Sequence, residues 1–322
     1  MTDFIPQIEP WIDDSELTEL KRIIESTFVV EHDLTKEFEQ MTCDLTGSKY
    51  AVAMTNGTVA LFCCLKALGV GPGDEVIVPN MTFIASANAV IMCGATPVLC
   101  EVDSKTFCMT VDTVKECKGQ HVGTFGDLGV LSYYGNKTIT CGEGGVVITN
   151  DKELRDKCYR LKNHGRDAKG FKHEYIGYNF CFTEMQAAIG ISQMKKLDSI
   201  LQKKKEIYEL YTQELSSVSW SLSPVSRVED CDPVHWFTSF LCEKKSELIE
   251  YANSKNIQTR EFFYPLHMQP CYKNYSNIVM LDSYEVSEDL FNRGISLPSS
   301  YNLTEENQIA VINTLKEWLF KN

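Results

Sequence analysis

The stretch that decides the fold is Tyr50–Glu101, YAVAMTNGTVALFCCLKALGVGPGDEVIVPNMTFIASANAVIMCGATPVLCE. Short apolar runs and helical patterns alternate along it, in the order Tyr50–Met54, Thr58–Leu68, Glu75–Val78, Phe83–Cys93 and Thr96–Glu101. A helix between two strands carries the chain back along the sheet, so the strands that it joins pair in parallel. The stretch therefore predicts an α/β fold with a mostly parallel central sheet.

The remaining sequence extends this pattern into two domains. A helix is expected over 14–26, and its apolar face would comprise Leu17, Leu20, Ile23 and Ile24. Further helices are expected over 35–46, 246–255 and 304–320, and further strands over Gly129–Ser132, Val146–Thr149 and Trp236–Cys242. A long helix from Thr183 to about Ser216 would bridge the two halves. We place the boundary near 212, between a large domain (1–212) and a smaller C-terminal α/β domain (213–322).

Composition argues against several classes of protein. The 322 residues are 43% hydrophobic and carry a net charge of -13, which disfavours binding to nucleic acid or to anionic membranes. The 13 cysteines include no C-x-x-C pair, so no metal site is expected. An acidic N-terminus without signal-peptide features predicts a cytoplasmic protein with reduced thiols. No apolar run approaches the ~20 residues that a membrane span needs.

Two segments next to predicted strands carry candidate chemistry. Thr55-Asn56-Gly57-Thr58 opens a predicted helix, where free N–H groups and the helix dipole suit an anion. The alternative is an ordinary capped helix after a glycine turn. Gly135–Gly145 places Lys137 in a glycine-rich loop between two strands. Partial burial would lower the pKa of Lys137 and make it a usable amine nucleophile, whereas a solvated loop lysine fits the sequence as well.

Two later segments carry groups that suit a ligand. Asn179, within Gly177-Tyr178-Asn179-Phe180, precedes a predicted helix and either offers its amide to a ligand or caps that helix. Arg260, Tyr264 and His267 share a short segment rich in aromatic residues, which suits an anionic, ring-containing ligand. The alternative is an aromatic core segment with a solvated arginine.

Taken together, these segments resemble the DegT/StrS family of nucleotide-sugar aminotransferases. The string Ser132-Tyr133-Tyr134-Gly135-Asn136-Lys137-Thr138-Ile139-Thr140, followed by Gly142-Glu143-Gly144-Gly145, is similar to the segment that carries the family's Schiff-base lysine. Similar strings follow the family's order at Ile5-Pro6, Pro10-Trp11-Ile12, Gly73–Pro79, Thr82-Phe83, Gly177-Tyr178-Asn179 and Gln186-Ala187-Ala188. Phe262–His267 and Ser296–Ser300 resemble the perosamine/viosamine-synthase branch.

The resemblance implies a fold, a cofactor and roles for single residues. The fold would be PLP fold type I, with helices on both faces of the sheet, and the cofactor would be pyridoxal 5'-phosphate. Lys137 would form the Schiff base with the cofactor, and Phe83 would stack on its pyridine ring. Its phosphate would be held by Gly57, Thr58 and Ser132, and by Asn179 from the neighbouring subunit, which implies a homodimer with shared active sites. Arg260, Tyr264 and His267 would face the sugar nucleotide.

The implied reaction moves an amino group, with L-glutamate as donor. The acceptor would be the C4 keto group of a nucleotide-linked 4-keto-6-deoxysugar, and the product a 4-amino-4,6-dideoxysugar. The family's dehydratase branch replaces the Schiff-base lysine by histidine, so Lys137 favours amino transfer. A 3-aminotransferase and a non-catalytic dimeric relative remain as alternatives.

One part of the family pattern is absent. Family members carry a Glu-Asp-Ala-Ala-Gln motif whose aspartate pairs with the pyridine nitrogen, and no such motif occurs here. Between Cys117 and Lys118 the chain lacks a strand–helix–strand unit of the pattern. Asp103 and Asp127 match other family positions and do not replace the aspartate. Three explanations stay open: a segment omitted from the printed sequence, a deletion that damages the site, or a deletion in a non-catalytic relative.

Overall fold

The computed structural model describes residues 4–109, 121–166, 171–216, 222–225 and 233–321. Its helices are α1 (Asp14–Ser26), α2 (Asp33–Thr46), α3 (Gly57–Ala67), α4 (Ala85–Met92), α5 (Lys152–Lys162), α6 (Glu184–Lys195), α7 (Leu197–Leu215), α8 (Lys245–Ser254), α9 (Glu285–Arg293) and α10 (Glu305–Leu319). Its strands are β1 (Tyr50–Met54), β2 (Glu75–Pro79), β3 (Thr96–Cys100), β4 (Gly129–Ser132), β5 (Gly145–Thr149), β6 (Leu222–Pro224), β7 (Thr238–Cys242), β8 (Arg260–Glu261) and β9 (Gly294–Leu297). Short 3-10 helices occupy Val122–Thr124 and Leu266–Met268.

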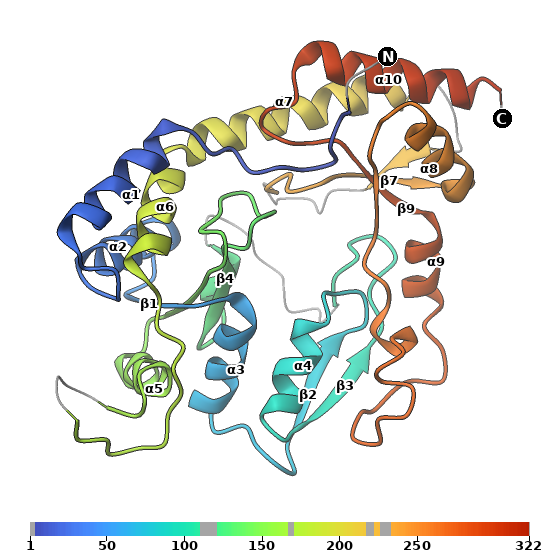
Figure 1. Ribbon diagram of the computed structural model, residues 1–322. Coiled ribbons are helices and arrows are strands. Elements are labelled where there is room, and N and C mark those ends of the chain that lie inside the picture. Colours follow the sequence, from blue (N-terminus) through green and yellow to red (C-terminus); the bar gives the residue numbers. More distant parts are fainter. Residues whose placement is uncertain (1–3, 110–120, 167–170, 217–221, 226–232, 322) are drawn as a thin grey trace.

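Helices cover both faces of the sheet formed by β1, β5 and β4. Side chains alternate across a strand, so successive residues enter different cores. Val52, Met54 and Val147 point into a core with α3, α4 and α5. Ala53 and Val146 point into a second core with α1, α2 and α6. Figure 1 shows these helices on either side of the strands. The two-sided packing agrees with the fold that the resemblance implied.

The pairing of the strands differs from a mostly parallel sheet. Among the described residues, β2 and β3 pair in parallel, with Glu75 opposite Thr96. The strands of the other sheet lie in the order β1-β5-β4, and both neighbours of β5 run antiparallel to it. The cause is the connection between β4 and β5, because a single loop without a crossover helix returns the chain antiparallel.

Of the strand edges that lack a partner strand among the described residues, two belong to β4 and β2. One is the side of β4 that faces away from β5, and the other is the side of β2 that faces away from β3. Ile77, in the middle of β2, is 66% exposed. The sequence lacks its strand–helix–strand unit between β3 and β4, so one of these edges belongs to the strand that follows the missing unit. The Cys117–Lys118 junction itself falls outside the described residues.

The C-terminal half forms its own core around a four-stranded antiparallel sheet, in the order β6-β7-β9-β8. The predicted helix from Thr183 to Ser216 is two helices, α6 and α7, separated at Lys196. Ile200 of α7 packs into the core of α1 and α2. Ile207, Tyr211 and Leu215 pack into the C-terminal core. Helix α7 thus belongs to both halves, and the boundary near 212 stays a prediction.

The N-terminal segment also crosses between the two halves. Ile5 lies in the C-terminal core, and its N–H donates to the Asn256 carbonyl at 2.9 Å. The chain then passes Gln7, whose N–H donates to Gln258 Oε1 at 3.1 Å, before it enters α1. Residues 5–7 therefore lie beside residues 256–258, although some 250 residues separate them in the sequence.

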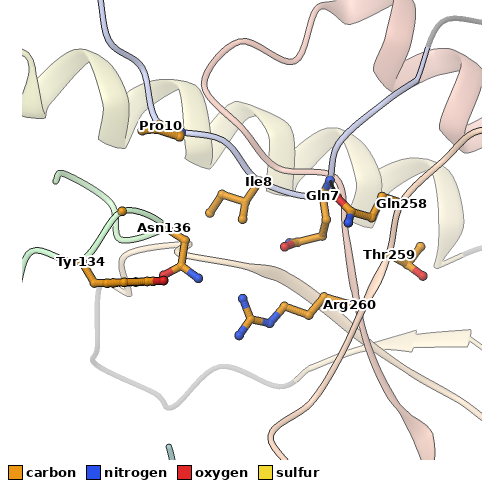
Figure 2. Close-up of a pocket in the computed structure, with 9 residues that line it drawn as sticks. Gln7, Ile8, Pro10, Tyr134, Asn136, Gln258, Thr259 and Arg260 are labelled. Atoms are coloured by element: carbon orange, nitrogen blue, oxygen red, sulfur yellow. Dashed lines mark hydrogen bonds between the residues drawn. The ribbon is translucent and has the colours of Figure 1, made fainter. Parts of the chain in front are cut away.

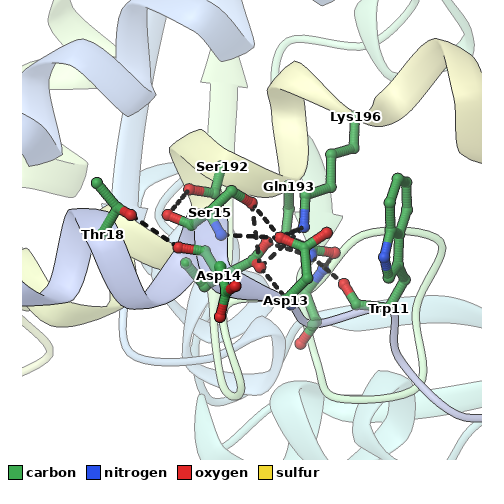
Figure 3. Close-up of polar contacts among 10 residues, drawn as sticks. Trp11, Asp13, Asp14, Ser15, Thr18, Ser192, Gln193 and Lys196 are labelled. Atoms are coloured by element: carbon green, nitrogen blue, oxygen red, sulfur yellow. Dashed lines mark hydrogen bonds and ion pairs between the residues drawn. The ribbon is translucent and has the colours of Figure 1, made fainter.

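The buried face of α1 differs from the predicted one. Leu17 and Ile24 are 63% and 67% exposed, whereas Ile23 is buried. Glu16 is buried on this face of α1 instead. Its carboxylate accepts hydrogen bonds from Nζ of Lys196 and from Nε2 of Gln193, each at 2.8 Å. Figure 3 shows Gln193 and Lys196 beside Asp13 and Ser15 at the start of α1. A paired carboxylate can be buried, and here it sets the rotation of the helix.

A buried lysine holds the end of β1. Lys162, on α5, donates to the carbonyl of Ala53 at 2.9 Å and pairs with Glu31 at 2.9 Å. The N–H of Ala53 donates to Glu39 of α2 at 2.8 Å. Burial lowers the pKa of Lys162, but the carboxylates of Glu39 and Glu31 outweigh it and leave the pKa raised. The strand that leads into Asn56 is therefore fixed from both helix layers.

The open edge of β2 generates a prediction. Ile77→Lys is expected to reduce self-association, because a charge on an edge strand opposes pairing with another chain. Light scattering during slow heating measures this effect. Leu68→Lys is the matched control, since it adds the same charge at an exposed apolar residue just after α3. Equal protection by both variants would show that net charge, and not the strand edge, governs association.

Candidate active site

Lys137 lies on the loop between β4 and β5, and backbone bonds close that loop at its base. The N–H of Tyr133 donates to Gly144 O, and the N–H of Cys141 donates to Tyr133 O, both at 2.9 Å. A turn bond from Lys137 N to Tyr134 O, also 2.9 Å, shapes the segment that carries the lysine. The glycine-rich sequence thus forms an ordered loop with a defined position for Lys137.

The amine of Lys137 is in an aromatic, partly buried environment. Its Nζ lies 3.5 Å from the centroid of the Trp236 ring. Burial lowers the pKa of Lys137 to about 8, and the nearby Arg260 guanidinium adds to this effect. A lysine with this pKa is about half neutral at pH 8, and the neutral amine is the nucleophilic form. The partial burial expected for a reactive lysine is therefore present.

The first turn of α3 meets the ends of β4 and β5. Asn56 caps the helix by accepting the N–H of Val59 at 3.1 Å, and the N–H of Gly57 is in the first turn. A Cβ built on Gly57 would lie 3.4 Å from Ser132 Oγ. One on Gly145 would overlap with the carbonyl of Asn56. Gly57, Thr58 and Ser132 are therefore brought together, and helix N–H groups beside hydroxyls suit a phosphate group.

A pocket of about 500 Å³ opens beside the lysine loop. It lies between the N-terminal segment, the lysine loop and the segment around β8, and its lining residues are Gln7, Ile8, Pro10, Tyr134, Gly135, Asn136, Gln258, Thr259 and Arg260. In Figure 2 the guanidinium of Arg260 points across the pocket toward Tyr134 and Asn136. Thr259 Oγ1 is buried without a hydrogen-bond partner among the described residues. The pocket thus offers a cation and polar groups to a ligand.

Arg260 also lines a second, more apolar pocket of about 210 Å³, together with Trp236, Phe237 and Phe263. Its guanidinium carbon lies 5.0 Å from the ring centroid of Phe237 and 5.8 Å from that of Phe263. No carboxylate of the described residues forms an ion pair with Arg260. The acid that lines this pocket, Glu261, is paired with Lys245 at 2.8 Å. An arginine held on aromatic rings is available to an anion.

The other two predicted sugar-nucleotide residues have structural contacts. His267 bonds Asn80 at 2.8 Å and Glu288 at 3.1 Å, and it stacks on Tyr284. Tyr264 packs edge-on against Phe291, with ring centroids 5.1 Å apart. Neither lines the two pockets formed by the described residues. Arg260 thus lines both pockets described above, whereas Tyr264 and His267 line neither, and a substrate contact stays a prediction for all three.

The remaining predicted cofactor residues lie on the surface of the single chain. Phe83 is 58% exposed, and its ring lies 6.1 Å from that of Phe263 at the edge of the second pocket. Asn179 is exposed, and its backbone bridges to Asn163. Exposure of Asn179 is compatible with the predicted contact to a neighbouring subunit, and both roles stay predictions.

Neither Asp103 nor Asp127 substitutes for the absent acidic motif. The carboxylate of Asp103 caps its own turn, accepting the N–H groups of Lys105 and Thr106 at 3.0 and 2.8 Å. Asp127 is exposed and precedes the start of β4, whereas Ser132 is at the other end of that strand. Both acids are thus placed as the sequence comparison with the family suggested.

Sequence reasoning missed Trp236 and the polar residues of the larger pocket. Trp236 was expected only as the start of a strand, which instead begins at Thr238. Gln7 and Gln258 carried no motif of their own. The Ile5-Pro6 and Pro10-Trp11 strings were a signal that the N-terminal segment has a fixed place, but a contact across some 250 residues has no local pattern in sequence.

Comparison with known proteins decides the family. A model described as the DegT/DnrJ/EryC1/StrS aminotransferase family matches residues 10–117 and 115–316. The chain belongs to this family. GDP-perosamine synthases of Escherichia coli O157:H7 and Vibrio cholerae are each 32% identical to it over 98% of the chain, covering 98% and 99% of their own lengths. The predicted family, the aminotransferase activity and the pyridoxal 5'-phosphate cofactor are confirmed.

Solved structures agree with the fold. An aminotransferase of Helicobacter pylori involved in the biosynthesis of pseudoaminic acid superposes with a TM-score of 0.90, at 22% identity over 99% of this chain and 100% of that one. DesV of S. venezuelae, in complex with a ketimine intermediate, superposes with a TM-score of 0.90 at 25% identity over 99% of both chains. PLP fold type I is therefore confirmed, with the strand pairing described above.

The relatives also bear on the absent motif. The alignment with the Escherichia coli relative runs over 366 positions, more than the 322 residues of this chain. The family model matches in two stretches that meet at residues 115–117. The printed sequence is continuous there. This chain therefore lacks an internal segment that the relative has, at the place where the acidic motif was expected.

The described residues fit two of the three parts of the cofactor. Gly57, Thr58 and Ser132 form a cradle for the phosphate, and Lys137 supplies the amine for the aldehyde carbon. The acidic motif that would serve the ring nitrogen does not occur in the sequence. Within the same part of the chain, no cluster of His, Cys, Asp and Glu is suited to a metal ion, and no helix is both long and apolar enough to cross a bilayer.

The close approach at Gly145 generates a prediction. Gly145→Ala is expected to weaken pyridoxal 5'-phosphate binding and to destabilise the fold by about 1–3 kcal/mol, because the new Cβ forces α3 away from β5. Absorbance titration and thermal unfolding measure the two effects. Gly71→Ala is the matched control, since a Cβ there meets no heavy atom within 4 Å. Unchanged cofactor affinity in Gly145→Ala would contradict the assigned phosphate site.

Proposed function

We propose that this protein transfers an amino group from L-glutamate to the C4 keto group of a GDP-linked 4-keto-6-deoxysugar, giving a 4-amino-4,6-dideoxysugar. The observation that carries the proposal is Lys137, which lies within the segment that resembles the family's Schiff-base segment and whose pKa burial lowers to about 8. The choice of GDP and of a perosamine-type product rests on the names of the two relatives that align over 98% of the chain.

The residues divide the work of the reaction. Pyridoxal 5'-phosphate, when bound, supplies an aldehyde that takes up the amino group and a ring that accepts electrons. Gly57, Thr58 and Ser132 orient it through its phosphate. The amine of Lys137 would hold the cofactor and, once freed by the amino donor, would carry a proton between the substrate carbon and the carbon of the cofactor's aldehyde group. A pKa of about 8 allows Nζ to act in both directions near neutral pH.

Arg260 is the residue that we assign to the charge of the substrates. Glutamate carries two carboxylates and a nucleotide sugar carries a diphosphate, so both substrates are anionic. The protein as a whole is acidic, with a net charge of -13. An arginine without a carboxylate partner among the described residues, at the wall shared by both pockets, gives these anions a local site despite the overall charge.

We further propose a homodimer in which Asn179 of one subunit reaches the cofactor phosphate of the other. Two observations support it. Asn179 is exposed in the single chain. The apolar residues Phe28, Val30 and Met185 are also exposed, at 57%, 68% and 43%, and Val30 bridges to Thr183 at the start of α6, so these side chains gather near one place.

A non-catalytic relative is the second candidate function. The specific observation that favours it is the internal deletion, which removes the acidic motif that would keep the pyridine nitrogen protonated. Such a protein would keep Lys137 and the phosphate cradle, bind the cofactor and fail to turn over. The two functions therefore agree on the binding of cofactor and differ on the catalytic cycle.

Trapping the cofactor tests the proposal. Pyridoxal 5'-phosphate followed by borohydride is expected to label Lys137, and the rate of labelling should rise with pH and level off above about pH 8, because only the neutral amine reacts. Peptide mass spectrometry locates the label, and Lys137→Met is the control. Formation of the 4-amino sugar from glutamate and the GDP-linked ketosugar, identified by NMR, completes the test. Labelling without turnover favours the non-catalytic relative, and no labelling refutes both.

Mixed dimers test the shared site. Lys137→Met and Asn179→Ala subunits, each inactive as homodimers, are expected to recover up to about a quarter of the activity when they are unfolded and refolded together, because one site of each mixed dimer is intact. The double variant refolded with itself is the control and should recover none. A monomer in sedimentation velocity, or no recovery in confirmed mixed dimers, would contradict the shared site.

A further inference from the structure

We propose that Trp236 is a positioning residue for Lys137, and that Lys204 of α7 holds Trp236 in place for this task. The inference rests on the proposed function, because it assigns to Trp236 a part in the reaction of Lys137. In that reaction the lysine must leave the cofactor and return to it. A free amine on a four-carbon chain has many rotamers, so a resting place close to its point of return saves the entropy of finding it again.

Two contacts join Trp236 to the lysine loop. The face of the indole ring lies under the amine, with Lys137 Nζ 3.5 Å from the ring centroid. The edge of the same ring donates from Nε1 to the carbonyl of Asn136 at 2.6 Å. One side chain thus fixes the backbone next to Lys137 and also receives the end of its side chain. A tryptophan face attracts an ammonium group and also packs against the neutral amine and its stem.

Helix α7 holds Trp236 from behind. Lys204 is buried, and its Nζ donates to the carbonyl of Trp236 at 3.1 Å and to that of Ser299 at 3.0 Å. One turn further along α7, Tyr208 stacks on His235 with ring centroids 4.0 Å apart. A buried amine that binds only carbonyls among the described residues is costly to keep. Its contacts tie Trp236 to the end of β9 and to the helix that joins the two halves.

Phe237, the residue after Trp236, contacts Arg260 in a similar way. Phe237 carries the guanidinium at 5.0 Å from its ring centroid, and the rings of Trp236 and Phe237 lie 4.0 Å apart. The two cations of the site therefore rest on adjacent aromatic rings. This arrangement keeps Lys137 and Arg260 near each other without a carboxylate between them, and a carboxylate there would compete with Arg260's anionic ligand.

Ring-current shifts in NMR test the inference. The full chain, freed of cofactor, is dimethylated on its lysines with ¹³C-formaldehyde, and the Lys137 resonance is assigned by its loss in Lys137→Arg. Methyl groups above an indole face are expected upfield of the other lysines. Trp236→Leu should remove this upfield shift, and Lys204→Met should reduce it. Trp11→Leu is the matched control: Trp11 carries Lys196 at 4.6 Å, so this variant should leave the Lys137 resonance unchanged.

Each outcome separates this inference from the proposed function. An unshifted Lys137 resonance in the wild-type protein overturns the inference. This result does not depend on whether any variant folds. An upfield shift that survives in folded Trp236→Leu overturns it as well. Borohydride trapping is run on a separate, unmethylated portion of each preparation. Labelled Lys137 with an unshifted resonance refutes the inference alone, and a shifted resonance without labelling refutes the proposed function alone.

Discussion

The site depends on one close backbone approach, in which the start of β5 lies against the carbonyl that precedes α3. Only a glycine at 145 permits it, because any Cβ would overlap with Asn56. The approach brings the first turn of α3 beside Ser132, and it places the lysine loop, which ends at Gly145, next to a helix N-terminus. The loop that carries Lys137 therefore begins and ends beside the first turn of α3, although 80 residues separate Gly57 from Lys137. Lys162 also holds the segment before α3 in place, because it donates a hydrogen bond to the carbonyl of Ala53 near the end of β1.

The two cations of this site, Lys137 and Arg260, contact aromatic rings. Lys137 and Arg260 rest on Trp236 and Phe237, and neither cation is paired with a described carboxylate. Burial and the neighbouring guanidinium therefore lower the pKa of Lys137, where a carboxylate partner would raise it. The lysine gains its nucleophilic form near neutral pH from the same arrangement that leaves Arg260 available to anionic substrates. An acidic protein thus acquires an anion-binding site through local desolvation.

The missing strand–helix–strand unit was predictable from the sequence, and the structure adds its physical consequences. The sheet divides into β1-β5-β4 and β2-β3, and both parts pack into one core with α3, α4 and α5. The remaining fold still superposes on complete relatives with TM-scores of 0.90. The losses are local: an exposed isoleucine on β2, and no acid of the family's motif for the ring nitrogen. Ser132 and the loop that carries Lys137 keep their places because β4 remains paired with β5.

The sequence by itself determined the bounds of several elements and singled out Lys137 as the candidate lysine. Tyr50–Met54, Gly129–Ser132 and the helix over 14–26 occur at the predicted bounds, because hydrophobic periodicity and capping are local properties. Lys137 was found for the same reason, within one loop. Only the tertiary structure decided that Glu16 is buried in place of Leu17, that His267 clamps β2 to α9, and that Trp236 receives Lys137. Each of these contacts joins residues far apart in sequence, and partners brought together by packing leave no periodic pattern in either segment.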